Sequence, residues 1–122
     1  MAKQFADRTH FVHLRSCYIF PDGNFTEASH LGGRGHLIEL CRIFEKAEQE
    51  GKCNSGRRLP MRVDHGMTFT DEPGGVFDES NHGHNAGYTL LGRMFAMGQI
   101  QGVIATVDDE LGIEYKQPGF YD

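Results

Sequence analysis

The segment Arg62-Val63-Asp64-His65-Gly66 combines a carboxylate, an imidazole and a flexible glycine. It directly follows the short apolar run Leu59-Pro60-Met61, which is typical of a brief buried strand. α/β proteins carry their chemistry on polar residues that emerge at the carboxyl ends of such strands, and a histidine can exchange protons near neutral pH. Asp64 and His65 therefore form a candidate site, and the alternative is a hydrogen-bonded turn.

Other polar side chains stand at comparable positions along the chain. His13 and Arg15 end a second strand-like run, and Tyr88 comes just before a helical pattern. Glu27 and His30 lie three residues apart in a polar segment. Both have a purely structural alternative: the His13 imidazole could do no more than hydrogen-bond a backbone carbonyl, and the segment with Glu27 and His30 could be a solvated loop.

The pattern of apolar residues predicts the elements that position these side chains. We expect one partial α/β domain over residues 1–122, with a strand at 9–19, a helix at 35–50, a strand at 59–64, a lid-like loop at 66–87 and a helix at 88–107. In the first helix, Glu39, Arg42, Glu45 and Glu48 are predicted to face outward. Strand, helix and strand in this order predict a right-handed βαβ unit with parallel strands.

Turn residues and glycines add detail to this outline. Pro21-Asp22-Gly23-Asn24 predicts a hairpin, and strand alternation places His13 on the face opposite Val12 and Leu14. Gly98 and Gly102 predict a close-packing face on the second helix, because glycines inside a helix otherwise destabilise it.

The long irregular segment at 66–87 contains His82 and His84, which resemble a small metal clip. Loops of this length within a compact domain are usually functional lids or are disordered. The alternative is a mobile loop with incidental histidines.

Composition limits the classes of function. The net charge of −5, with scattered Lys and Arg, predicts no nucleic-acid partner and no polybasic membrane contact. We expect no membrane span, since the longest apolar runs are shorter than the roughly 20 residues that a spanning helix needs, and no signal peptide. Three cysteines without paired spacing predict reduced thiols in a cytoplasmic protein.

Four motifs in order resemble the mannonate dehydratase family, in the C-terminal part of its barrel. They are Thr9-His10-Phe11-Val12-His13-Leu14-Arg15, then Phe25-Thr26-Glu27-Ala28-Ser29-His30, then Leu59 to Gly66, and Gly87-Tyr88 with Gly92-Arg93. The resemblance implies part of a (β/α)8 TIM barrel and a lyase of sugar acid metabolism. That enzyme dehydrates D-mannonate to 2-keto-3-deoxy-D-gluconate with Mn²⁺ or another divalent metal.

The same resemblance implies roles for individual residues. His13 and Asp64 would ligate the metal, and a mixed nitrogen and oxygen donor set suits Mn²⁺. His65 and Tyr88 would be catalytic, whereas Arg15, Glu27 and His30 would lie in or near the substrate site.

The sequence also departs from the family pattern. Ala86 stands where the family commonly has proline, and Cys17, Cys41 and Cys53 do not lie in matching motifs. Two βα units cannot close a barrel, and their open edges need a partner. We therefore expect a chain that is inactive alone and forms a homo-oligomer or complements a barrel fragment. The alternative is a non-catalytic, self-associating remnant that binds a metal or sugar acid weakly.

Overall fold

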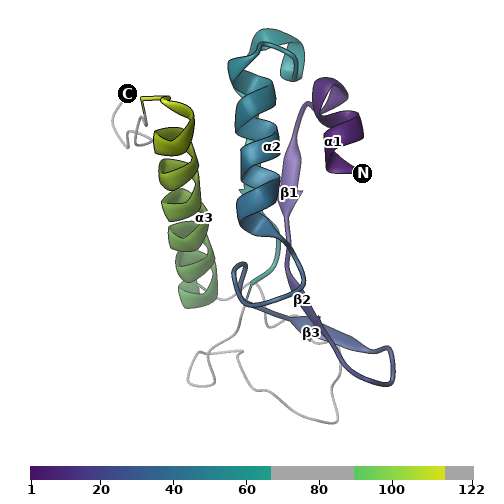
Figure 1. Ribbon diagram of the computed structural model, residues 1–122. Helices are drawn as coiled ribbons and strands as arrows, with labels where there is room; N and C mark the ends of the chain where they lie inside the picture. The colour runs from purple at the N-terminus through teal and green to yellow at the C-terminus, as the bar shows by residue number, and fades with distance from the viewer. Residues whose placement is uncertain (67–89, 115–122) are drawn as a thin grey trace.

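The computed structural model describes residues 1–66 and 90–114 (Figure 1). The helices are α1 (Ala2–Phe5), α2 (Leu37–Gln49) and α3 (Leu90–Leu111), with the short 3-10 helices η1 (Ala6–Arg8) and η2 (Asn54–Gly56). The strands are β1 (Val12–Leu14), β2 (Cys17–Ile19), β3 (Phe25–Glu27) and β4 (Met61–Val63). The strands form two separate two-stranded sheets.

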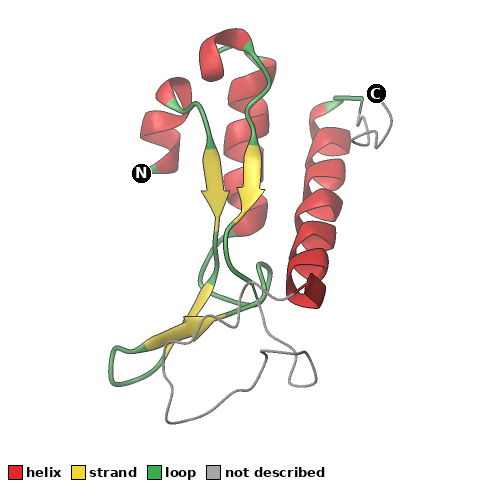
Figure 2. Cartoon of the chain, turned by 180° about the vertical axis from the view of Figure 1, so that it is seen from behind, coloured by secondary structure: helices red, strands yellow, loops and turns green. Residues whose placement is uncertain are grey.

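The first sheet pairs β1 with β4 in parallel, and α2 lies between them in the sequence and packs beside them (Figure 2). Val12 stands opposite Met61, and the ladder continues beyond β4 through a 2.9 Å bond from the Asp64 amide to the Leu14 carbonyl. Parallel strands with a helical connection are the α/β arrangement that the sequence predicts. Both strands therefore end at the same edge of the sheet.

The predicted strand at 9–19 is divided in two. β1 ends at Leu14, and β2 belongs to an antiparallel hairpin with β3 that extends beyond the carboxyl ends of β1 and β4 (Figure 2). The chain changes direction at Ser16, whose carbonyl accepts the Ala28 amide and whose hydroxyl accepts the Gly35 amide. These bonds compete with continuation of β1, and propensity alone does not reveal them.

One apolar core joins the βαβ unit to α3. Val12 and Leu14 are buried while His13 is exposed, as alternation predicts. The other buried apolar residues are Ala6, Leu37, Cys41, Phe44, Ala47, Cys53, Leu59, Val63, Ala96, Ile100, Val103 and Val107. A fully buried leucine or valine side chain contributes about 1.5–3 kcal/mol relative to exposure, so this cluster holds the described elements together.

Only one face of α3 is covered by the described residues. Ala96, Ile100 and Val103 are buried, whereas Leu91 and Met94 are 55 % and 60 % exposed. By length and composition alone this helix could cross a membrane, but the core helix of a soluble protein meets the same criterion. Because its buried face packs against α2, we treat α3 as a core helix with an open side (Figure 1).

The predicted close packing at Gly98 and Gly102 does not occur within the described part of the chain. A Cβ atom added at either position would meet nothing within 4 Å. The close approach at this helix involves Gly66 instead, where a Cβ atom would lie 3.3 Å from the Gly92 carbonyl oxygen of α3.

Two acidic side chains are buried where α2 meets α3, although the sequence pattern placed Glu45 on the outward face. Glu45 is 5 % exposed and Asp108 is 2 % exposed. Burial, followed by the charges of Asp108 and Glu48, raises the pKa of Glu45 to about 7. Burial also raises the pKa of Asp108. Below neutral pH, a proton held on Glu45 lets the pair form a hydrogen bond instead of two repelling charges.

This pair predicts that stability falls as the pH rises. Glu45 ionises near 4.5 in the unfolded chain but near 7 in the folded one, so the folded state binds more protons between these values. Between pH 5 and pH 8 we expect the free energy of unfolding to fall by about 1–3 kcal/mol less in Glu45→Gln than in the unaltered chain, because the amide is neutral throughout. Urea unfolding at both pH values measures it, with exposed Glu39→Gln as the control. An unchanged pH dependence in Glu45→Gln would contradict the prediction.

Candidate active site

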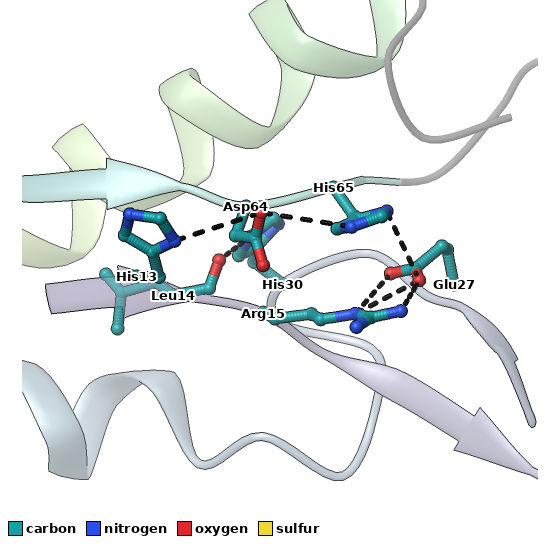
Figure 3. Close-up of polar contacts among 7 residues, drawn as sticks. All are labelled: His13, Leu14, Arg15, Glu27, His30, Asp64 and His65. Carbon is teal, nitrogen blue, oxygen red and sulfur yellow. Dashed lines mark hydrogen bonds and ion pairs between the residues drawn. The ribbon is translucent and has the colours of Figure 1, made fainter. Parts of the chain in front are cut away.

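The carboxyl ends of β1 and β4 bring three predicted site residues together (Figure 3). Nδ1 of His13 lies 4.0 Å from Oδ1 of Asp64, and Nε2 of His65 lies 3.9 Å from the same oxygen. The side chains of Asp64 and His65 are 22 % and 16 % exposed, while that of His13 is 46 % exposed. A carboxylate thus stands between two imidazoles at the rim of the parallel sheet.

His65 adopts a left-handed backbone conformation, with φ at +57°. A non-glycine residue pays roughly 1–3 kcal/mol for such a sparsely populated region. The next residue, Gly66, is buried against α3, where the Gly92 carbonyl and Ala96 leave little room for a side chain. The sharp turn at the end of β4 therefore directs the imidazole back toward Asp64 and the hairpin.

The hairpin supplies a second charged group. Nε of Arg15 donates to Oε1 and Oε2 of Glu27 at 3.1 and 3.2 Å, and Nη2 also donates to Oε1. The Arg15 guanidinium lies 5.4 Å from the centre of the Phe25 ring, a cation–π geometry. Hydrogen bonding to Glu27 is the largest cause that raises the pKa of Arg15. Oε1 of Glu27 lies 3.5 Å from Nδ1 of His65.

His30 lies in the interior. It is 1 % exposed, and its Nε2 lies 2.7 Å from the Leu14 carbonyl oxygen, to which it donates. The sequence alternative of a solvated loop therefore does not apply to His30. The bond to a backbone carbonyl, which the sequence offered as the alternative for His13, is made by His30, whereas His13 is exposed at the strand end. The substrate-site role that the resemblance implies for His30 stays a prediction.

Several other sequence predictions lie outside the described residues. Tyr88, His82 and His84 fall between residues 67 and 89, so their predicted roles stay predictions. All three cysteines are free thiols. Burial raises the pKa of Cys41 to about 12, which leaves it a protonated core residue at neutral pH.

A divalent metal fits the site only in part. His13 and Asp64 offer one nitrogen and one oxygen donor, a combination that suits Mn²⁺. Within residues 1–66 and 90–114, however, no group of three or more His, Cys, Asp or Glu side chains is placed to hold a metal ion. Catalytic metal sites usually have about three protein ligands. The pair can therefore serve only as part of a larger donor set.

The root of the β2–β3 hairpin, where Gly33 lies beside Ser16, Cys17 and Ala28, depends on close packing at Gly33. A Cβ atom there would lie 2.3 Å from the Ser16 hydroxyl, 2.9 Å from the Ala28 Cβ and 2.9 Å from the Cys17 carbonyl oxygen. Two of these neighbours are backbone or Cβ atoms that cannot rotate away. Gly33 thus allows the segment after β3 to lie against the start of β2, which in turn places Glu27 near His65.

We expect Gly33→Ala to lower the free energy of unfolding by about 1–3 kcal/mol through this steric clash. Gly98→Ala is the matched control, because a Cβ there meets nothing and alanine favours a helix by up to about 1 kcal/mol. Urea denaturation followed by circular dichroism compares the two. Equal unfolding midpoints for Gly33→Ala and the unaltered chain would show that the root is not close-packed.

The described fold and site define an α/β protein with imidazole and carboxylate groups at the ends of parallel strands. The model of the D-mannonate dehydratase (UxuA) family matches residues 1–114. The chain therefore belongs to the D-mannonate dehydratase family. It is also 36 % identical over 113 residues to mannonate dehydratase 2 of Agrobacterium fabrum, which covers 91 % of the chain and 26 % of that relative.

Two more relatives show the same coverage. The mannonate dehydratase of Saccharophagus degradans is 34 % identical over 110 residues, covering 88 % of the chain and 26 % of the relative. That of Brucella canis is 32 % identical over 109 residues, covering 88 % and 25 %. The chain thus spans about a quarter of the length of these relatives. That this quarter is the C-terminal part of a TIM barrel stays a prediction.

Proposed function

We propose that this chain supplies part of the active site for the dehydration of D-mannonate to 2-keto-3-deoxy-D-gluconate. The observation that supports this most is the meeting of His13, Asp64 and His65 at neighbouring strand ends in a member of the mannonate dehydratase family. Removing water from a sugar acid requires one proton to leave the carbon next to the carboxylate and another to reach the departing hydroxyl. A histidine can make such transfers near neutral pH.

In this proposal, some residues bind the metal and others transfer protons. Asp64 and His13 would hold Mn²⁺ or another divalent ion together with donors beyond the described residues. Such an ion, when bound, polarises a substrate oxygen and makes the neighbouring C–H more acidic. His65 carries a proton between substrate and solvent from its largely enclosed position, and Tyr88 is the proposed second acid/base.

We also propose that the chain is inactive alone and acts in the cytoplasm with the rest of a barrel. The two-donor set and the open face of α3 both support an incomplete site. The incomplete donor set also favours a second candidate, a non-catalytic chain that self-associates and binds a metal or sugar acid weakly. Adding the Agrobacterium fabrum relative with its matching segment deleted separates them, because only the first candidate then forms product from D-mannonate.

In that assembled system, His65→Asn should lower turnover about 10²–10⁴-fold while metal content stays nearly unchanged, since asparagine cannot exchange a proton near neutral pH. Asp64→Asn should lose metal and turnover together, because a neutral amide is a poor ligand for a hard cation. Metal analysis and product formation from D-mannonate test both. The proposed division fails if His65→Asn keeps its turnover, or loses metal as completely as Asp64→Asn.

The open face of α3 supports self-association when no barrel partner is present. Apolar side chains of a helix are normally buried, yet Leu91, Met94 and Met97 of α3 are exposed. We expect sedimentation at micromolar concentration to give a mass above the monomer, with and without Mn²⁺, and Met94→Lys to shift it toward the monomer. Ile38→Lys, an exposed position on α2, is the control. A monomeric unaltered chain would refute self-association.

A further inference from the structure

Three contacts connect the hairpin to His65. Arg15 binds both carboxylate oxygens of Glu27, and Oε1 of Glu27 faces Nδ1 of His65 at 3.5 Å (Figure 3). The Phe25 ring also lies against the Arg15 guanidinium. A carboxylate held by a two-pronged guanidinium contact has lost most of its rotational freedom. Glu27 is therefore a fixed acceptor beside the imidazole.

The two ring nitrogens of His65 face different groups. Nδ1 is buried on the side of Glu27, and Nε2 points toward Oδ1 of Asp64 at the longer distance of 3.9 Å. A neutral imidazole has one N–H and one lone pair, and a carboxylate oxygen repels the lone pair but accepts a hydrogen bond from the N–H. Oε1 of Glu27 is nearer than Oδ1 of Asp64 and is held in place by Arg15, so the single proton is better placed on Nδ1. The 3.5 Å between Nδ1 and Oε1 is longer than the usual N–H···O distance of about 2.7–3.2 Å, so we expect the two groups to move closer when Nδ1 carries the proton.

We propose that Glu27 is a positioning residue that holds His65 in the Nδ1–H tautomer, so that the Nε2 lone pair faces the Asp64 side of the site. The resemblance instead implies that Glu27 lies in or near the substrate site. An unperturbed neutral imidazole favours the Nε2–H tautomer, so the carboxylate would reverse the usual preference. The same arrangement, a carboxylate that orients a functional histidine through its second nitrogen, is a general device for fixing an imidazole.

Arg15 sets the strength of this effect. Its positive charge largely neutralises Glu27, so the carboxylate acts on His65 chiefly as an oriented acceptor and not as a free negative charge. The hairpin root fixes the distance, because Ser16 and Gly33 anchor the strands that carry Arg15 and Glu27. The antiparallel β2–β3 sheet thus belongs to the site, although it lies outside the parallel β1–β4 sheet.

Long-range ¹H–¹⁵N correlation spectra of the labelled full chain report the tautomer directly, at about pH 8.5, two units above the ordinary histidine pKa. His65→Asn assigns the His65 signals among the seven histidines. We expect the Nδ1–H pattern in the unaltered chain, reversal to Nε2–H in Glu27→Ala, and retention in Glu27→Gln, whose amide oxygen still accepts. Glu110→Gln, which breaks the distant pair with Arg42, should leave His65 unchanged.

An Nε2–H pattern in the unaltered chain overturns the proposal by itself, even if Glu27→Ala fails to fold. An unchanged Nδ1–H pattern in a folded Glu27→Ala also overturns it. The effect on turnover rests on the proposed function: in the assembled system, Glu27→Ala should lower kcat about 10–100-fold with little change in KM, and Glu27→Gln should recover most of it. A raised KM with normal kcat would instead assign Glu27 to the substrate.

Product formation and the His65 tautomer test the proposed function and the positioning role independently. If no variant of the assembled system forms product, the proposed function is wrong, whereas the tautomer of His65 still decides the positioning role. If product forms but the tautomer is Nε2–H, the function stands and the positioning role is rejected.

Discussion

The carbonyl oxygen of Leu14 is the point on which the site depends. It accepts the Asp64 amide at 2.9 Å and Nε2 of the buried His30 at 2.7 Å. A carbonyl oxygen has two lone pairs, and both are used here to join the end of β1, the end of β4 and the segment after β3. Loss of either donor would leave a buried acceptor less well satisfied, at about 1–3 kcal/mol. The segments that carry His13, Asp64 and Glu27 are thus linked through one atom.

Much of the local structure could be predicted from the sequence. The helical spacing of Leu37, Cys41 and Phe44 predicts α2, and alternation correctly orients His13 away from the core. The turn residues at Pro21 to Asn24 predict the β2–β3 hairpin. These features depend on neighbours within a few residues, which a single sequence contains.

The errors in prediction concern interactions between distant residues. Nothing in the pattern around Arg15 and Ser16 shows that the strand ends at Leu14, because Ser16 bonds to residues after β3. Glu45 has the spacing of an exposed residue, yet α3 covers it. The contact between Glu27 and His65 joins positions that are 38 residues apart, and only the folded hairpin brings them together.

The strained backbone at His65 has a consequence for how this chain tolerates change. With φ at +57°, glycine would be less strained than histidine at this position, because it adopts this conformation at no steric cost. A selection for thermal stability alone would thus favour replacing the residue proposed to move protons. Improved stability and retained chemistry are therefore in opposition at this position, and a stabilising change elsewhere, such as on the open part of α3, would avoid that trade-off.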